Sequence, residues 1–432
     1  MNAPAAYPAP ARKPGVHKRR SRKLGDGEFV ALMALIMSLQ ALAIDTMLPA
    51  LAVLAGELGV ADANRRQLVV GVFLLASGMC SLFPGSLSDR YGRRPVLFVG
   101  LAIYIAMTLL CAVATSFPML LAARVLQAVG SAALTVMPNA IIRDQVSGDR
   151  MARLLSMVAV VFMTVPVMAP SLGQALLGIA GWRGIFVAMA LLGGIVGVWA
   201  WLRLPETLHP ENRQDIHLAT ILRNMRKTLL TRGSTGYVLG GAVIFGSLFG
   251  FVNSAQQLIG EHFGAGTRFP LIFAGCAATM IVANFTNARI VERYGARRVS
   301  HGALLLFIGV SAVQVVMAHL PHQTLWQFVP VMAANMSLIG FIGANFGSIA
   351  LQPFGAIAGA ASSVQMFVRI TLGAIMGALV GQAYDGTARP LAYALLGGSL
   401  ACLALVLYSE QGKLFRRVLP PGSQREVGNS RL

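Results

Sequence analysis

The sequence predicts an all-α integral membrane protein with about twelve transmembrane helices, arranged as two related six-helix halves. Hydrophobic residues make up 56% of the chain and charged residues only 12%, against roughly 45–50% and about 25% in soluble domains. Apolar runs of about 20 residues, the length that crosses a bilayer, recur from end to end. A short motif also recurs 203 residues apart, close to half of the 432-residue chain.

Each apolar run is expected to form a helix, because lipid offers no hydrogen-bond partner for the backbone N–H and C=O groups. The predicted spans are 29–55, 67–87, 96–115, 117–141, 155–180, 184–202, 236–258, 269–288, 302–320, 325–349, 358–382 and 388–408. The first run has a basic lead-in but is longer than the core of a signal peptide, so it is interpreted as an uncleaved span.

The net charge of +19 reflects membrane topology rather than a nucleic-acid surface. With this assignment of spans, 28 of the 35 Lys and Arg residues fall on one side of the membrane, in the two tails and in the loops that follow even-numbered spans. Five fall in loops on the opposite side, and two lie inside spans. Positive residues stay in the cytosol, so both termini are expected to be cytoplasmic. The four cysteines all lie in predicted spans without paired spacing, which makes disulfide and zinc sites poor interpretations.

The chain divides into five predicted segments. These are a disordered basic cytoplasmic tail (1–27), an N-terminal six-helix bundle (28–204), a cytoplasmic linker (205–235), a C-terminal six-helix bundle (236–408) and a cytoplasmic tail (409–432). In the linker, apolar residues recur at helical spacing among basic ones. This pattern is typical of a basic amphipathic helix on the membrane surface, although a plain linker is an equal alternative. The apolar residues are Leu218, Ile221, Leu222, Met225 and Leu229.

An internal repeat supports the division into halves. The segment after the second span reads Gly-Ser-Leu-Ser-Asp-Arg-Tyr-Gly-Arg-Arg (85–94), and the one after the eighth reads Ala-Arg-Ile-Val-Glu-Arg-Tyr-Gly-Ala-Arg (288–297). Arg-Tyr-Gly occurs in both, directly preceded by an acid. Because each copy follows the second span of its half, the repeat indicates duplication of a six-span unit.

The 85–94 segment resembles the loop signature of the major facilitator superfamily, G-x-L-x-D-R-x-G-R-R. Arg124-Val-Leu-Gln127-Ala128 in span four is similar to the superfamily's R-x-x-Q-G element, with alanine in place of glycine. Ala-Pro170-Ser-Leu-Gly173 in span five is similar to the Pro/Gly motif of its antiporters.

Further segments resemble the Bcr/CflA branch of drug:proton antiporters. They are Asp45-Thr-Met-Leu-Pro49, Asn287-Ala-Arg-Ile-Val and the stretch from Gln352 to Ser363. The resemblance implies two six-helix bundles that flank a central cavity and expose it alternately. It also implies drug or metabolite export in exchange for protons, across a bacterial-type inner membrane. An uptake symporter or a specific metabolite exporter on the same fold is the alternative.

Asp45 is the one carboxylate placed within the apolar part of a span. An ionised acid at the centre of a membrane helix costs about 2.5–3.5 kcal/mol, so such a residue usually has a function. Protonation removes the cost, and Asp45 could therefore exchange a proton for a substrate. The alternatives are a structural acid permanently paired with an arginine and an acid higher in the helix, near the outer surface. The resemblance implies proton coupling by Asp45 with Arg124 as its partner in span four.

Arg369 in span eleven is a less expected charge. It could attract an anionic or zwitterionic solute in the cavity, extend to the cytosolic interface, or pair with Asp45. We group it with three amide side chains as predicted substrate-cavity residues, namely Gln127, Asn253 and Gln365.

Two further groups are expected to serve conformational change. In the superfamily, the acid of the loop signature latches the two halves on the cytosolic side against span eleven, and Asp89 could meet a helix N-terminus there. The latch residues are predicted to be Gly85, Asp89, Arg90, Gly92, Arg93 and Asp144. Pro166, Pro170 and Gly173 are expected to bend span five and to allow close packing.

The chain has no G-x-x-x-x-G-K-[ST] phosphate loop, no H-E-x-x-H and no G-x-S-x-G, so ATP drive and the common hydrolase sites are not expected. We therefore expect no enzymatic activity, no cofactor and no metal, with the proton gradient as energy source. The expected partners are a small-molecule substrate and the lipid bilayer, not nucleic acid, and the protein is expected to work as a monomer.

Overall fold

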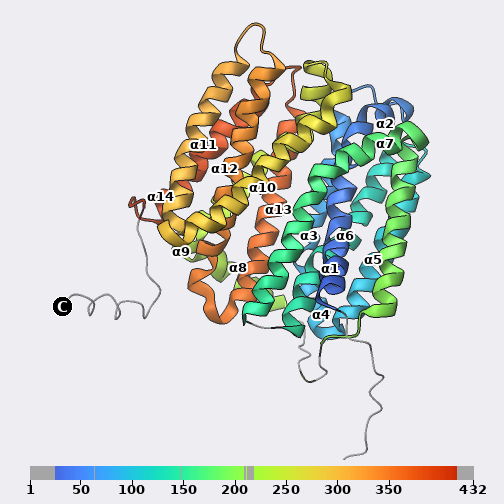
Figure 1. The fold of residues 1–432 in the computed structure, drawn as a ribbon, viewed down its shortest axis with the longest axis vertical. Helices are drawn as coiled ribbons and strands as arrows, with labels where there is room; N and C mark the ends of the chain where they lie inside the picture. The colour runs from blue at the N-terminus through green and yellow to red at the C-terminus, as the bar shows by residue number, and fades with distance from the viewer. Residues whose placement is uncertain (1–24, 63, 147, 209–210, 212–217, 416–432) are drawn as a thin grey trace, which may run out of the picture.

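The computed structural model describes residues 25–62, 64–146, 148–208, 211 and 218–415. Within these residues the chain is helical and contains no strand. Figure 1 shows two bundles of long helices side by side, one from the N-terminal half and one from the C-terminal half of the chain. This arrangement agrees with the predicted all-α membrane fold.

The helices of the first half are α1 (Asp26–Asp45), α2 (Leu51–Glu57), α3 (Leu68–Cys80), α4 (Phe83–Tyr91), α5 (Arg93–Ala112), α6 (Phe117–Gln145) and α7 (Gly148–Arg203). The linker helix is α8 (Leu218–Leu230), and the second half contains α9 (Arg232–Ala255), α10 (Phe269–Tyr294), α11 (Ala296–Ala318), α12 (Leu325–Leu351), α13 (Ala358–Gln382) and α14 (Arg389–Ser409). Short helical turns join several of them: η1 (Leu48–Ala50), η2 (Arg65–Gln67), η4 (Gln256–His262), η5 (Gly266–Arg268) and η6 (Gln352–Ile357).

The described helices account for the predicted spans. Ten are long and apolar enough to cross a membrane, or eleven when α3 and α4, bent by 47°, count as one broken span. One of the ten, α7, contains two predicted spans, because its backbone leaves helical geometry at Gly181, where φ is +66°. Figure 1 shows α7 as two helical stretches that meet at the upper end of the molecule.

The first predicted span agrees with an apolar run at Asp26–Glu57 that is long enough to cross a membrane, but its helix is broken within this run. Its helix begins at Asp26, inside the segment expected to be a disordered tail, and residues 1–24 lie outside the described residues. The helix ends at Asp45 rather than near residue 55, and the chain continues through η1 to α2. Pro49 in η1 has no N–H to donate and clashes with a preceding helical turn, so it stops α1 here. The break places Asp45 at a helix end within the protein.

The repeated Arg-Tyr-Gly motif forms the same turn in both halves. Gly92 joins α4 to α5 with φ +104°, and Gly295 joins α10 to α11 with φ +84°. L-residues rarely adopt this region, so glycine is required at both turns. The motif is therefore a structural device of each six-helix unit.

The two halves contact each other chiefly through α3 against α13 and α7 against α10. We call the end of the molecule that carries α4 and α8 the linker end, and the opposite end the far end (Figure 1). The linker helix α8 packs on α9 and α13. Met225 and Leu229 pack against the core, whereas Arg223, Arg226 and Lys227 are exposed, as the amphipathic pattern predicts. The side chains of Leu218, Ile221 and Leu222 lie outside the described residues.

Candidate functional site: buried charges and the contacts between halves

Asp45 is the last residue of α1, and its side chain is buried with 6% of the residue exposed. No hydrogen bond or ion pair joins its carboxylate to any residue that the structure describes. The hydroxyl of the following residue, Thr46, donates to the carbonyl of Leu42 at 2.5 Å and stabilises the last turn of the helix. The result is a buried acid on a fixed helix end without a partner of its own.

Arg124 lies on α6 and is fully buried. Its Nε donates to the carbonyl of Val69 at 3.1 Å, and its Nη2 donates to the carbonyl of Ala43 at 2.9 Å. The guanidinium also lies 4.2 Å from the centre of the Phe73 ring. Backbone carbonyls of α1 and α3 thus solvate this charge in place of water.

Gln127 completes the shell around Arg124. Its Oε1 accepts from Arg124 Nη1 at 2.7 Å, and its Nε2 donates to Thr108 Oγ1 at 2.6 Å. Because the side chain is fully buried and both ends of the amide are bonded, Gln127 positions the arginine in this conformation. Gln127 is predicted as a substrate-cavity residue, and in this conformation both atoms of its amide bind protein groups.

The expected ion pair between Asp45 and Arg124 is not formed in this conformation. Arg124 instead binds the carbonyl of Ala43, two residues before Asp45 on the same helix. The sequence placed both charges in one region but could not show that carbonyls would occupy the donors of the arginine. Arg124 therefore contacts the same helix as Asp45, but it binds a backbone carbonyl of α1 and not the Asp45 carboxylate.

The Pro/Gly element of span five lies against the helix end that carries Asp45. Gly173 on α7 is so close to the carbonyl of Thr46 that a Cβ atom at this position would overlap it. Pro166 and Pro170 precede it within α7, whose backbone stays helical at both. The expected close packing is present, and it is made with the residue next to Asp45.

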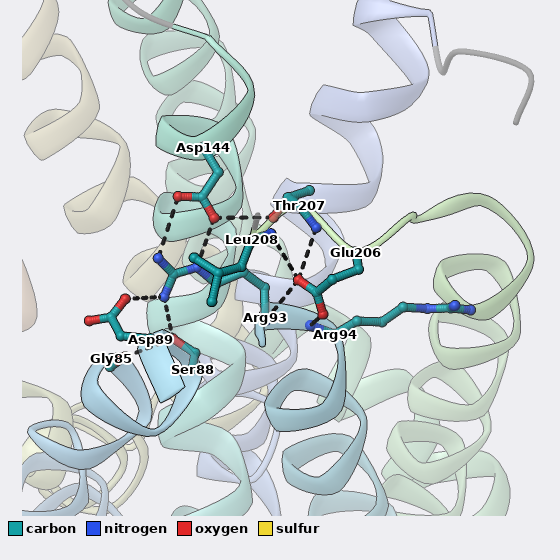
Figure 2. A network of polar contacts seen from close by, with 9 residues as sticks. All are labelled: Gly85, Ser88, Asp89, Arg93, Arg94, Asp144, Glu206, Thr207 and Leu208. Atoms are coloured by element: carbon teal, nitrogen blue, oxygen red, sulfur yellow. Dashed lines mark hydrogen bonds and ion pairs between the residues drawn. The ribbon is translucent and has the colours of Figure 1, made fainter. Parts of the chain in front are cut away.

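Arg93 is the centre of the network at the linker end (Figure 2). Its Nε donates to Asp144 Oδ2 at 2.7 Å, and its Nη1 donates to Asp89 Oδ1 at 2.5 Å and to Ser88 Oγ at 2.6 Å. The arginine thereby joins the start of α5 to α4 and to the end of α6. The motif residues Asp89, Arg93 and Asp144 are brought together as the sequence predicts. Gly85 takes part through its carbonyl, which accepts from Ser88 Oγ at 2.8 Å.

The acid that meets a helix N-terminus here is Glu206, not Asp89. Its carboxylate accepts the backbone N–H groups of Arg93 at 3.0 Å and Arg94 at 3.1 Å, the first residues of α5 (Figure 2). It also accepts the N–H groups of Thr207 and Leu208. The N–H groups of Arg93 and Arg94, in the first turn of α5, have no partner within the helix and favour an anion. Glu206 was missed because it follows the last span of the half, far from the motif in sequence.

The predicted latch between Asp89 and the second half is not formed in this conformation. Among the described residues, no hydrogen bond or ion pair joins Asp89 to the second half, and Arg90 contacts the ring of its neighbour Tyr91, with its guanidinium 5.5 Å from the centre. Asp89 is close to Arg93, which satisfies it within its own half. The loop network therefore holds α4, α5 and α6 together in this conformation.

Asn64, at the far end, makes polar contacts between the halves. Its Nδ2 donates to the carbonyls of Gln382 at 3.0 Å and Tyr384 at 2.8 Å. Its Oδ1 accepts from Gln257 Nε2 at 3.0 Å, and its carbonyl accepts from Gln382 Nε2 at 2.7 Å. One asparagine of the first half thus binds both η4 and the segment after α13.

An ion pair between Arg66 and Glu261 lies beside Asn64. Only 8% of the Arg66 side chain is exposed, against 41% for Glu261. Together these contacts join the two halves at the far end, through residues that lie outside the sequence motifs. Polar residues in the short connection after α2 were the only sequence signal.

Arg369 lies on α13 and is half-buried. Its guanidinium lies 4.3 Å from the centre of the Phe245 ring, and its Nη2 donates to Met366 Sδ at 3.4 Å. Its Nε is buried and has no hydrogen-bond partner. No described acid lies within ion-pair distance, so the alternative pairing with Asp45 is not present in this conformation.

The other predicted cavity residues do not gather into one cluster. Asn253 is fully buried between α9 and α13; its Nδ2 donates to the carbonyl of Phe249 at 2.8 Å, while its Oδ1 has no partner. Gln365 is half-buried one helical turn before Arg369, and a Cβ at Gly347 of α12 would lie 3.6 Å from its Nε2. Only Gln365 and Arg369 are neighbours.

A second acid at the linker end, Glu410, was also missed. It follows α14 and binds Arg297 Nε at 2.7 Å, and the hydroxyl of Tyr237 donates to it at 2.6 Å. Burial alone would raise the pKa of Glu410, but the hydrogen bonds from Tyr237 and Arg297 outweigh it, and the pKa is lowered. Glu206 and Glu410 each follow the last helix of their half and are 204 residues apart. This spacing is close to the 203-residue offset of the Arg-Tyr-Gly repeat, so a comparison of the two halves could have identified both acids.

The described residues contain no group of three or more His, Cys, Asp or Glu side chains that could hold a metal ion. The family model described as Major Facilitator Superfamily matches residues 33–378. The chain belongs to this superfamily. It is accordingly a multi-pass membrane protein of a transporter family, as its loop signature indicates.

Relatives in this superfamily carry names associated with drug resistance. A bicyclomycin resistance protein homolog from Haemophilus influenzae is 28% identical over 383 residues, which cover 88% of this chain and 95% of the relative. The multidrug resistance protein MdtL of Klebsiella pneumoniae is 29% identical over 329 residues, covering 74% of this chain and 80% of the relative. These similarities support the predicted resemblance to the Bcr/CflA branch.

Solved structures show the same fold. A bacterial homolog of the human lysosomal transporter Spinster, in an inward-facing and unoccupied conformation, has a TM-score of 0.66 at 17% identity, covering 90% of this chain and 96% of that one. The human organic anion transporter MFSD10 has a TM-score of 0.61 at 19% identity, covering 90% of this chain and all of that one. The major facilitator fold, predicted from the spans and the repeat, is thus confirmed.

Proposed function

We propose that this protein exports small molecules in exchange for protons, by alternating access across a bacterial-type inner membrane. The observation that carries the proposal is the buried, unpartnered carboxylate of Asp45 at the end of α1. Relatives named for bicyclomycin and multidrug resistance support drugs as the exported class.

Asp45 has the properties of a coupling site. An ionised carboxylate within a membrane helix costs about 2.5–3.5 kcal/mol, and protonation removes this cost. Its helix end is held by Arg124 through the carbonyl of Ala43 and by Gly173 against Thr46. A change in the packing of α7 against α1 would therefore alter the surroundings of the carboxylate directly. Proton binding and rearrangement of span five are in this way coupled at one helix end.

The contacts at the far end support a conformation closed to the outside. With both termini in the cytosol, as the distribution of Lys and Arg predicts, the far end faces outward. There Asn64 and Arg66 bind the second half, while the described residues of the linker-end network bind within their own halves. We infer that Asp45 releases its proton inward from this conformation and is reprotonated after the far end opens.

The proton gradient is sufficient as the energy source. One charge moving through the membrane potential supplies about 2.3 kcal/mol per 100 mV. A tightly coupled exchange can therefore raise the outside concentration of a substrate roughly 50-fold per proton at that potential. No nucleotide site is required.

The test is substrate-induced proton movement in inside-out membrane vesicles that contain the full-length protein. Addition of bicyclomycin or another drug from a small panel should release protons from the acidified lumen, measured as recovery of acridine-dye fluorescence. Asp45→Asn should abolish this recovery, because an amide cannot carry the proton.

Glu211→Gln is the matched control, since Glu211 is an exposed acid in the linker. It should behave as the unchanged protein does. Drug accumulation in the vesicles without proton release would contradict the proposal, and so would undiminished proton release by Asp45→Asn. Proton movement into the lumen with the drug would instead indicate a symporter.

A further inference from the structure

Arg369, the second arginine within a membrane-spanning helix, differs from Arg124 in the partners that surround it. Both guanidinium groups lie over an aromatic ring, at 4.2 Å for Arg124 over Phe73 and 4.3 Å for Arg369 over Phe245. Arg124 donates to two backbone carbonyls and to Gln127. Arg369 donates only to the weak acceptor Met366 Sδ and leaves its buried Nε unbonded.

The position of Arg369 prevents it from reaching water at the membrane surface. The part of α13 that is long and apolar enough to cross a membrane is Ala360–Gln382, and Arg369 lies nine residues from its start. At a rise of 1.5 Å per residue this is about 14 Å, close to the middle of a hydrocarbon core about 30 Å thick. Arginines extend to the interface from near helix ends, so that alternative from the sequence does not apply.

A guanidinium at this depth remains charged, because arginine does not lose its proton in proteins. Its cost must then be offset by an anion or by strong acceptors. The described residues supply neither an acid nor a carbonyl. The missing counter-ion is thus the distinctive property of this position.

We infer that Arg369 binds the carboxylate of an amphipathic organic anion, which is a substrate of the transporter. A carboxylate can accept two parallel N–H groups of a guanidinium, which matches the unbonded Nε and the fork of terminal nitrogens. Gln365, one turn earlier on α13, supplies a further polar group on the same side. This assignment of the anion as a substrate depends on the proposed transport function.

The surroundings also specify the rest of the ligand. Phe245 and Phe249, one turn apart on α9, are in edge-to-face contact with centroids 5.8 Å apart. An aromatic or branched apolar body next to the carboxylate could pack on these rings. The site therefore favours an acid with a hydrophobic body over a small, fully hydrated anion or a cationic drug.

The experiment measures binding without a gradient, so that its outcome does not depend on proton coupling. The purified full-length protein in neutral detergent is titrated calorimetrically with 1-naphthaleneacetate, its uncharged amide and 1-naphthylmethylamine. We expect the acid to bind at least tenfold more tightly than the amide, and the amine to bind most weakly.

Arg369→Gln should remove the preference for the acid, and Arg369→Lys should keep part of it by retaining the charge without the planar fork. Arg268→Gln, which removes an exposed arginine, is the matched control and should leave the preference unchanged. Asp45→Asn should also keep it, which separates this inference from the proposed proton exchange.

Equal binding of acid and amide by the unchanged protein would overturn the inference, as would absence of binding by all three probes. A preference that survives in Arg369→Gln would overturn it too. If Arg369→Gln does not fold, Arg369→Lys decides, because an unaltered preference and affinity in that variant would exclude the bidentate contact.

Discussion

In each half of the molecule, a glycine of the fifth span packs tightly against the backbone of the first span. The two halves differ in the charged side chains that lie on these spans. In the first half, Gly173 of α7 lies against the backbone of Thr46. In the second half, Gly377 of α13 lies against the backbone of Phe249, where a Cβ would lie 2.9 Å from the Phe249 carbonyl carbon. The two pairs are 203 or 204 residues apart in sequence. Duplication therefore preserved the close contact between the first and fifth spans of each half.

The charges at these contacts did not stay equivalent. The residue 203 positions after Asp45 is Leu248, so the second half has an apolar residue where the first has the coupling acid. At the 204-residue offset that relates Gly173 to Gly377 on these same spans, the counterpart of Arg369 is Val165, so the first half has an apolar residue where the second has a half-buried base. The backbone contact fixes the helices, and this leaves individual side chains free to take separate functions.

The largest expected difference between the halves is at the two linker-end acids. Glu410 forms a largely buried pair with Arg297, whose side chains are 9% and 15% exposed. Removing one partner of a buried pair costs about 3–5 kcal/mol, and we expect the lower end for Glu410→Gln. Glu206→Gln keeps an acceptor for the N–H groups of α5 and should cost about 1 kcal/mol. Thermal unfolding of the purified variants measures both, and equal losses would contradict the difference.

The pH dependence of this effect has a definite sign. The pKa of Glu410 is lowered from its ordinary value of 4.5. Its ionised form therefore stabilises the folded protein fully above that value, and the contribution is lost as pH falls through the lowered pKa. The melting temperatures of the unchanged protein and Glu410→Gln should differ most near neutral pH and converge in acid. A gap that widens below pH 4.5 would be inconsistent with the ion pair.

A single added methyl group can disrupt the close glycine contact between the first and fifth spans. Gly173→Ala would force a Cβ into the carbonyl of Thr46, and overpacking of this kind costs about 1–3 kcal/mol. Because the displaced backbone is next to Asp45, we expect slower transport in vesicles as well as a lower melting temperature. Gly178→Ala, on the same helix with open space around it, is the control and should be neutral or slightly stabilising. Normal transport by Gly173→Ala would show that this contact does not position Asp45.

The smallest expected effect concerns the contacts between the halves at the far end. Arg66→Gln breaks the pair with Glu261, and a partly exposed pair contributes up to about 1 kcal/mol. This would raise the population open at the far end up to about fivefold. Hydrogen exchange should increase in residues 64–67 and 382–386, whereas Arg65→Gln, which changes the exposed neighbour, should leave it unchanged. Faster exchange throughout the chain would indicate general destabilisation instead.

The sequence by itself determined the fold and the identity of the unusual residues. Span length, the asymmetry of Lys and Arg and the repeated Arg-Tyr-Gly depend on local hydrophobicity and on charge, which a linear sequence displays directly. For the same reason Asp45, Arg124 and Arg369 were identified, because a charge within an apolar run needs no neighbour to be recognised. The repeat likewise marked the glycines at 92 and 295, although the turns that they form were seen only in the structure.

Only the tertiary structure decided which groups those charges meet. Arg124 is solvated by the carbonyls of Ala43 and Val69, and a backbone carbonyl leaves no mark in the sequence. Glu206 reaches α5 across more than a hundred residues, and Asn64 joins two halves that are separate in sequence. Each such contact depends on how whole helices are placed relative to one another. The partners of a buried charge are therefore a property of packing, whereas the need for a partner is already present in the sequence.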